Sequence, residues 1–155
     1  MSSNEEEVFG CVVVDLDGTL CNVEHRVHHA ANKDWDLFHS GLSDDTVNES
    51  VAMIINNLPH SIKLIACTGR NERYRNQTIE WLLKNDIIFD EILMRPNDNF
   101  SPDYVLKIKM IVDFFDGNID IAKEQIICCL DDRDKVVEAF REAGFNCWQV
   151  KNESY

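Results

Sequence analysis

Five short apolar runs divide the chain and predict the strands of a β-sheet. Their hydrophobic positions are continuous rather than alternating, which is typical of strands in a parallel sheet that is covered on both faces. The runs are VFGCVVVDL (8–16), IKLIACT (62–68), FDEILM (89–94), QIICCL (125–130) and NCWQV (146–150).

Between these runs, apolar residues recur at helical spacing and predict four helices. The first is expected over residues 45–57, where Thr46 and Glu49 have the spacing of a capping box. The second is expected over residues 72–85.

The third and fourth helices carry clear start and stop signals. The third is expected to begin at SPDYVLK, with Ser101 as its N-cap and Pro102 at its first helical position. The fourth is expected over residues 134–143, with Gly144 placed for a left-handed cap. The core stripe expected for the third helix is Val105, Ile108, Val112 and Phe115.

The alternation of strands and helices predicts an α/β fold with a doubly wound, Rossmann-like parallel sheet of about five strands. We expect one domain over residues 8–155, preceded by a short acidic tail at residues 1–7. Residues 21–44 lie between the first strand and the first crossover helix and are too long for a turn. We therefore expect a flap or a small helical cap there.

Polar residues follow the strands at the edge where an open α/β sheet binds its ligands. They are Asp15 and Asp17 after the first run, Thr68 to Arg70 after the second, Arg95 and Pro96 after the third, and Asp131 to Arg133 after the fourth. Clustered carboxylates need a compensating cation, and no Lys or Arg is close in sequence to Asp15 and Asp17. Oxygen ligands from Asp15, Asp17 and Asp131 suit a hard divalent ion such as Mg²⁺. Beside such an ion, one carboxylate can act as a nucleophile and another as an acid/base.

The charge balance is strongly acidic, because 28 Asp and Glu against 15 Lys and Arg give a net charge of −13. Such a field repels nucleic acid at long range unless a local basic patch overrides it. It still permits a small phosphorylated ligand held by one or two arginines.

The six cysteines form no C-x-x-C pair, and most lie in the apolar runs. We expect buried free thiols in a reducing cytosol rather than a zinc or disulfide framework. With no apolar stretch of about 18 residues and an acidic N-terminus, the sequence predicts neither a membrane span nor a secretory signal. The expected location is the cytoplasm, with no membrane partner.

The stretch DLDGT (15–19) resembles the first motif, D-x-D-G-[TV], of the haloacid dehalogenase (HAD) superfamily of phosphatases. Thr68, Lys107 and the pair Asp131–Asp132 follow in the order of that superfamily's pattern. Over essentially the whole chain after residue 8, the sequence is also similar to the 3′-phosphatase domain of phage-type polynucleotide kinase/phosphatase. This similarity rests on ACTGRNERYRNQTIEWL (66–82), PDYVLK (102–107), LDDRDKVVEAFREAG (130–144) and CWQV (147–150). The kinase half has no counterpart, because no G-x-x-x-x-G-K-[ST] motif occurs.

The resemblance implies a catalytic role for four residues. Asp15 would attack phosphorus and become a phosphoaspartate. Asp17 would protonate the leaving alkoxide and then take a proton from the hydrolytic water, while its backbone carbonyl touches Mg²⁺. Thr68 would donate a hydrogen bond to a phosphate oxygen, and Lys107 would pair with Asp15 and with the phosphoryl oxygens. If Asp17 must be protonated to act, turnover should favour mildly acidic to neutral pH.

The resemblance and the strand ends also imply metal and substrate contacts. Asp131 and Asp132 would hold the metal together with Asp15 and Asp17. The remaining candidates contact substrate: Arg26, Arg70 and Asp103 by resemblance, and Gly69 and Arg95 by their place on the same rim.

Simpler structural explanations remain open for some of these residues. Asp103 and Lys107 are four residues apart and could form a pair on a helix surface. Trp35 and Phe38 fit the packing of a small cap helix, with stacking on a base as the alternative.

The substrate also stays open between two nucleotide classes. The acidic balance and the absent kinase half favour a free (deoxy)nucleoside monophosphate slightly, whereas the whole-chain resemblance favours the 3′-phosphate end of DNA or RNA. A phosphotransferase and a catalytically inactive binding module are further alternatives. Against the inactive module stands the complete set of Asp15, Asp17, Thr68, Lys107 and Asp131.

Overall fold

A five-stranded parallel sheet organises the protein in a computed structural model, which describes residues 8–150. The strand order is β5-β4-β1-β6-β7, and every neighbouring pair is parallel. The strands are β1 (Gly10–Val14), β4 (Ile62–Asn71), β5 (Glu91–Arg95), β6 (Ile126–Asp131) and β7 (Cys147–Gln149). Each of the five predicted runs therefore overlaps a strand, and the doubly wound α/β fold is confirmed. Strand β4 continues to Asn71, so Thr68 to Arg70 lie within it and not after it.

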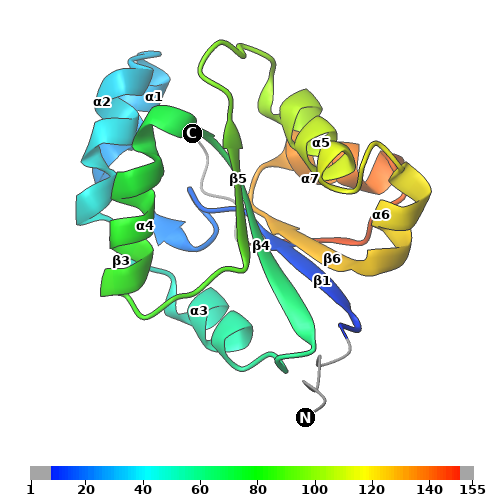
Figure 1. Ribbon diagram of the computed structural model, residues 1–155. Coiled ribbons are helices and arrows are strands. Elements are labelled where there is room, and N and C mark those ends of the chain that lie inside the picture. The colour runs from blue at the N-terminus through cyan, green and yellow to red at the C-terminus, as the bar shows by residue number, and fades with distance from the viewer. Residues whose placement is uncertain (1–7, 151–155) are drawn as a thin grey trace.

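Helices cover both faces of this sheet, as Figure 1 shows. On one side lie α3 (Glu49–Asn56) and α4 (Arg75–Lys84), and on the other lie α5 (Asp103–Phe114), α6 (Ile119–Gln125) and α7 (Asp134–Glu142). Successive residues of β1 point to opposite faces, so Val12 and Val14 belong to one buried cluster and Cys11 and Val13 to the other. This two-sided burial explains why the strand is continuously apolar.

The first crossover helix starts later than its sequence pattern predicts. Thr46 and Val47 form a short strand, β3, which pairs antiparallel with β2 (Cys21–Asn22). The helix then begins at Glu49, and its N-cap Asn48 donates its side-chain amide to the carbonyl of Thr19 at 2.9 Å instead of capping the helix. The predicted capping box is wrong because Thr46, its first residue, lies in β3 and pairs with β2.

The third predicted helix is also shifted. Helix α5 begins at Asp103, with Pro102 rather than Ser101 at the N-cap position and no side-chain cap. Its buried residues are Leu106, Lys107 and Ile111. Of the predicted core stripe, Ile108 and Phe115 pack against the core while partly buried, whereas Val105 is 48% exposed, so the stripe is confirmed only in part. A lysine replaces an apolar residue on the buried face because its charge is needed at the end of the sheet.

The last predicted helix agrees with the structure, where α7 covers Asp134–Glu142. Gly144 follows it with a φ of +96°, a left-handed conformation that favours glycine. Helix α6 was not predicted.

Residues 21–44 form short elements beside the sheet rather than one turn. They are β2, the 3₁₀ turn η1 (Glu24–Arg26), α1 (Val27–Ala31), α2 (Trp35–Ser40) and the 3₁₀ turn η2 (Gly41–Asp44). Figure 1 shows α1 and α2 next to α4, at the end of the sheet toward which β5 points. The side-chain amide of Gln77 on α4 donates to the carbonyl of Ser40 at 3.1 Å and to the hydroxyl of Ser43 at 2.7 Å.

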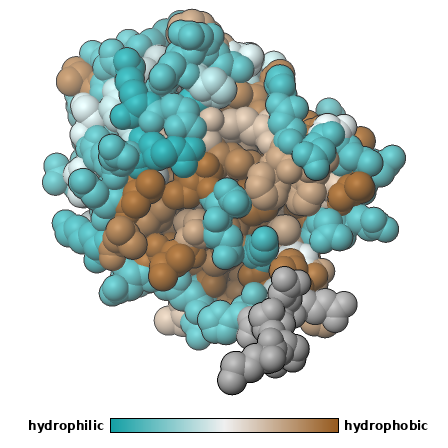
Figure 2. All heavy atoms as spheres, in the orientation of Figure 1, coloured by the Kyte–Doolittle hydropathy of each residue, from teal (hydrophilic) through white to brown (hydrophobic). Residues whose placement is uncertain are grey.

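Figure 2 shows an apolar region on the face of the molecule that presents β5. This region lies across the middle of the view, and polar residues surround it. A shallow pocket beside this edge strand is lined by Ile92, Leu93 and Phe114 among others.

All six cysteines are buried and free, as predicted. Within residues 8–150, no helix is both long enough and apolar enough to cross a membrane. The acidic tail predicted at residues 1–7 lies outside the described residues.

Candidate active site

Three carboxylates and a lysine meet at the carboxyl ends of β1 and β6, and we call them the carboxylate cluster: Asp15, Lys107, Asp131 and Asp132. Asp15 follows β1, and Asp131 ends the neighbouring parallel strand β6. The ammonium group of Lys107 on α5 lies 2.7 Å from Asp15 Oδ1 and 2.7 Å from Asp131 Oδ2. All four residues are buried. The structure thus brings together residues that are far apart in the chain.

The carboxylate cluster holds more negative than positive charge. Burial, and then the negative charge of Asp131, raises the pKa of Asp15 well above its ordinary value. The same two causes raise the pKa of Asp132 to about 6. Burial alone would lower the pKa of Lys107, but Asp131 and Asp15 outweigh it and raise that pKa. The lysine is therefore a fixed cation, and one cation is too few for three buried carboxylates.

This deficit fits a divalent cation. One carboxylate oxygen from each of Asp15, Asp131 and Asp132 lies within 4.8 Å of the others. Asp132 Oδ2 is buried and has no hydrogen-bond partner among the described residues. Three acidic oxygen donors around a common point are the ligands that Mg²⁺ prefers. Asp17, the fourth predicted ligand, has its carboxylate outside this group.

Two threonines complete the inner end of the site. The hydroxyl of Thr19 donates to Asp15 Oδ2 at 2.8 Å and lies 3.4 Å from Asp132 Oδ1. The chain reaches Thr19 through Gly18, whose φ of +85° is left-handed. Thr68 is buried in β4, and its hydroxyl accepts a hydrogen bond from the backbone N–H of Arg70 at 3.1 Å. Thr19 was not among the predicted site residues, although it is the last residue of DLDGT.

A second group of charges lies beside the first, and we call it the arginine cluster: Asp17, Arg26, Asp45 and Arg70. Asp17 Oδ1 accepts hydrogen bonds at 2.6 Å from both Arg26 and Arg70. Asp45 accepts two further bonds from Arg26, at 2.7 and 2.6 Å. Arg26 and Arg70 are among the largest fully buried side chains. Two carboxylates and two guanidinium groups make this cluster electrically balanced.

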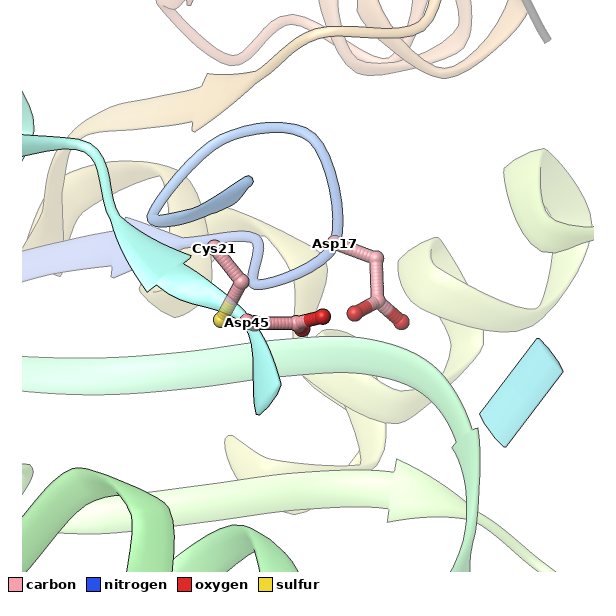
Figure 3. A group of neighbouring side chains, drawn as sticks. All are labelled: Asp17, Cys21 and Asp45. Carbon is pink, nitrogen blue, oxygen red and sulfur yellow. The ribbon is translucent and has the colours of Figure 1, made fainter. Parts of the chain in front are cut away.

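Figure 3 shows the carboxylates of Asp17 and Asp45 turned toward one another, with Cys21 beside Asp45. These three residues have the proximity of a metal site. However, the guanidinium of Arg70 contacts Asp17 and also lies 3.5 Å from the sulfur of Cys21. Burial alone would raise the pKa of Asp17, but Arg70 and Arg26 outweigh it and hold that pKa below its ordinary value. The negative charge here is already compensated by arginine, and Asp17 is an anion.

The predicted substrate residues Gly69, Arg95 and Asp103 form the next part of the rim. Asp103 accepts hydrogen bonds from Arg95 at 2.5 Å and from Arg133 at 2.7 Å. It does not form the surface pair with Lys107 that their spacing allowed, because Lys107 is buried against the carboxylate cluster. A Cβ atom on Gly69 would lie 2.6 Å from Asp103 Oδ1, so this close approach needs glycine.

A cavity of about 480 Å³ connects these groups to solvent. Asp15, Thr68 and Lys107 line it and are buried, whereas Trp35 and Phe100, which also line it, are exposed. Its other charged lining residues are Asp17, Arg73, Arg95, Asp103, Arg133 and Lys135. Basic residues outnumber acidic ones in this lining, although the chain as a whole is acidic. The cavity thus has a local excess of basic residues, of which Arg95 and Arg133 are paired with Asp103 and Arg73 is paired with Asp36.

Asp45 is the clearest residue that the sequence analysis missed. It is buried, and it orients Arg26 and also accepts a 2.7 Å contact from His25. It lies in a stretch, LSDDTV, that carries no local signal of a site. Nonlocal contacts bring it next to Asp17, among them the pairing of β2 with β3 and a hydrogen bond from Trp81 Nε1 to its carbonyl at 2.9 Å.

Comparisons with known proteins agree with this geometry. The model of the family described as the phosphatase domain of polynucleotide kinase PNKP matches residues 10–155. Among curated proteins, one from Autographa californica nuclear polyhedrosis virus, described as a bifunctional polynucleotide kinase/RNA ligase, is 26% identical over 126 residues. That match covers 79% of this chain and 17% of the viral protein.

Solved structures show the same relationship. A chain in the structure of the Pnkp1/Rnl/Hen1 complex superposes with a TM-score of 0.77 at 28% identity, covering 97% of this chain and 49% of that one. A haloacid dehalogenase-like hydrolase from Streptococcus pneumoniae superposes with a TM-score of 0.65 at 14% identity, covering 94% and 88%, and supports the fold alone. The chain thus spans about half the length of the matched chain of that complex and under a fifth of the viral protein.

Proposed function

The chain belongs to the family of polynucleotide kinase PNKP phosphatase domains, within the HAD phosphatases, and from this premise we propose that it removes the 3′-phosphate from nucleic-acid ends. The proposed reaction depends on Mg²⁺ and passes through a phosphoaspartate on Asp15. The observation that supports the proposal most strongly is the carboxylate cluster, in which Asp15 forms an ion pair with Lys107. Both residues line a cavity whose other lining residues include Arg73, Arg95, Arg133 and Lys135.

The first chemical step belongs to Asp15. Its Oδ1 is held by Lys107 and its Oδ2 by Thr19, so the carboxylate is fixed and ready to attack. An oxygen of Asp15 forms a bond to phosphorus while the bond from phosphorus to the ester oxygen breaks. Lys107 and Thr68 line the cavity beside Asp15, and their ammonium and hydroxyl groups would hold the phosphoryl oxygens. Mg²⁺, held by Asp15, Asp131 and Asp132, would supply the remaining positive charge.

The protons are handled by Asp17. It protonates the leaving alkoxide, and its carboxylate then accepts a proton from the water that hydrolyses the phosphoaspartate, releasing phosphate and free Asp15. The ionised state of Asp17 in the structure suits the second step. For the first step it must gain a proton, and the negative charge of an entering phosphate favours this by raising its pKa. The arginine cluster holds Asp17 in place for both steps.

Two observations favour a nucleic-acid end over a free nucleotide. The cavity has basic residues at its mouth, where the rest of a polymer would leave the site. The family and the relatives are described by polynucleotide activities. The second candidate is a nucleoside monophosphate, which the cavity volume of about 480 Å³ would accommodate and the net charge of −13 would favour.

The deciding experiment is phosphate release from matched substrates: an oligonucleotide with a 3′-phosphate, the same oligonucleotide with a 5′-phosphate, and 3′- and 5′-mononucleotides. Each is measured with Mg²⁺, with a chelator, and with Asp15→Asn. The proposal expects the 3′-phosphorylated oligonucleotide to have the highest kcat/KM. A preference for 5′-mononucleotides would replace it with the nucleotidase, and release no faster than with Asp15→Asn would support an inactive module.

A further inference from the structure

We propose that Trp35, His39 and Phe100 form a subsite for the nucleoside that carries the phosphate, with the two aromatic rings stacking on its base and His39 hydrogen-bonding to it. This inference rests on the proposed function, because it assumes a nucleotide substrate. All three residues line the same cavity as Asp15 and Lys107. A phosphate bound at the inner end would therefore extend its nucleoside toward them.

Helix α2 is fixed relative to the reacting groups by the arginine cluster. The Nη1 group of Arg26 donates to the carbonyl of Phe38 at 2.7 Å, and its guanidinium lies over the ring of Phe38 at 4.3 Å. The same arginine binds Asp17. One buried side chain thus sets both the position of Asp17 and the position of the helix that carries Trp35 and His39.

His39 has the features of a ligand contact rather than of a core residue. Its Nδ1 atom is buried and has no hydrogen-bond partner among the described residues. A buried polar atom without a partner costs stability, and a ligand group can supply that partner once the imidazole turns to present this nitrogen to the cavity that His39 lines. Burial lowers the pKa of His39 to about 4, an effect that Asp17 opposes only partly. The imidazole is therefore neutral at pH 7 and can donate or accept a hydrogen bond.

Trp35 and Phe100 supply the apolar part of the subsite. The ring of Trp35 lies over His39 at 6.4 Å between centroids with an interplanar angle of 28° and meets Phe38 edge-on at 5.8 Å. Its neighbours hold it in place, yet it is 48% exposed. Phe100 is 92% exposed in the loop between β5 and α5. Exposed aromatic rings beside a phosphate site are a stacking platform that tolerates any base.

The test compares two oligonucleotide 3′-phosphates that differ only at the last nucleoside, which carries a base in one and is abasic in the other. For the wild-type protein, loss of the base should lower kcat/KM by roughly 10-fold, as expected for one stacked base. Trp35→Ala and Phe100→Ala should each lower kcat/KM for the substrate with the base and change that for the abasic substrate by less than about twofold. His39→Phe, which keeps a ring but removes both nitrogens, should raise KM more than it lowers kcat.

Matched controls lie elsewhere on the surface. Trp148 and Phe9 are exposed aromatic residues that do not line the cavity, so Trp148→Phe and Phe9→Ala should behave as wild type with both substrates. A direct readout is tryptophan fluorescence in the Asp15→Asn background, where the substrate with the base should quench Trp35. The quenching should persist in Trp148→Phe and vanish in Trp35→Phe.

The two proposals fail in different ways. If wild-type protein dephosphorylates the normal and abasic ends equally well, or if Trp35→Ala impairs both equally, the subsite is overturned while the 3′-phosphatase stands. If neither end is dephosphorylated at all, the proposed function itself fails.

Discussion

Asp15 and Asp17 are separated by one residue, yet the two clusters that they join differ in charge. The carboxylate cluster sets three carboxylates against one lysine and leaves Asp132 Oδ2 without a hydrogen bond among the described residues. The arginine cluster sets two carboxylates against two arginines, with each carboxylate hydrogen-bonded. A balanced buried cluster is a rigid support, whereas an unbalanced one needs a ligand. The carboxylate cluster thus has room for a cation, whereas the arginine cluster holds the proposed acid/base Asp17 in a fixed position.

The largest effect should come from removing the nucleophile of the unbalanced cluster. Asp15→Asn keeps the shape of the side chain but removes the attacking carboxylate, so kcat should fall by at least roughly 1,000-fold. Because the buried carboxylate is unfavourably charged, the variant should unfold at the same temperature as wild type or higher. Phosphate release and thermal unfolding measure the two effects.

The control for Asp15→Asn is Asp113→Asn, which breaks an exposed pair with Lys109 and should change neither quantity. If Asp15→Asn retained a tenth of wild-type turnover, Asp15 would not be the nucleophile.

Substitutions in the arginine cluster should have their clearest effect on the free energy of unfolding. Arg26→Met leaves Asp45 and Asp17 buried with too little positive charge, so the free energy of unfolding should fall by about 3–5 kcal/mol. Arg73→Met removes an arginine from an exposed pair with Asp36 and should cost less than about 1 kcal/mol. Urea denaturation compares them, and equal losses in the two variants would contradict the role given to the arginine cluster.

The excess of negative charge in the carboxylate cluster can be tested by measuring the free energy of unfolding against pH in the absence of metal. Because the pKa of Asp132 rises from 3.8 to about 6 on folding, ionising it destabilises the folded state as pH increases through that interval. Asp132→Asn should therefore gain roughly 2–3 kcal/mol of stability relative to wild type as the pH rises from 4 to 7. His39, whose pKa is lowered on folding, contributes equally to both proteins and cancels in this difference.

Mg²⁺ provides the complementary measurement on the same pair of proteins. At pH 7 the ion should raise the unfolding temperature of wild-type protein, because it binds only the folded state. The shift should be much smaller for Asp132→Asn, which lacks one carboxylate ligand. An equal shift in both proteins would place the ion elsewhere.

The same contrast explains what the sequence could and could not predict. Asp15, Thr68 and Asp131 follow apolar runs, so a parallel sheet necessarily carries them to one edge. The arginine cluster could not be predicted as a cluster, because its members meet only through nonlocal contacts. No cation is close in sequence to Asp15 and Asp17, yet Lys107, Arg26 and Arg70 reach them in the structure.

The errors in the predicted secondary structure also arise from nonlocal contacts. The helix predicted from residue 45 begins at Glu49, because Asp45 serves the arginine cluster and the next residues form β3. The core stripe predicted for α5 was only partly right, because the most buried face of the helix carries Lys107 for its charge, which a hydrophobic pattern cannot show. Local patterns thus identified the strands, although β4 continues to Asn71, beyond its apolar run, and they failed where charge or distant pairing overrode them.

The smallest expected effect concerns Thr19, which touches both Asp15 and Asp132. Thr19→Val has nearly the same shape but leaves Asp15 Oδ2 without its donor, so kcat should fall by roughly 10-fold, the equivalent of one hydrogen bond to a charged group. Thr19→Ser keeps the hydroxyl and should retain most of the activity. Because the hydroxyl orients the carboxylate and does not itself bind the substrate, KM should stay within about twofold of wild type in both variants. A rise in KM with unchanged kcat would instead make Thr19 a substrate ligand, and the carboxylate cluster would then extend further into the cavity than its hydrogen bonds indicate.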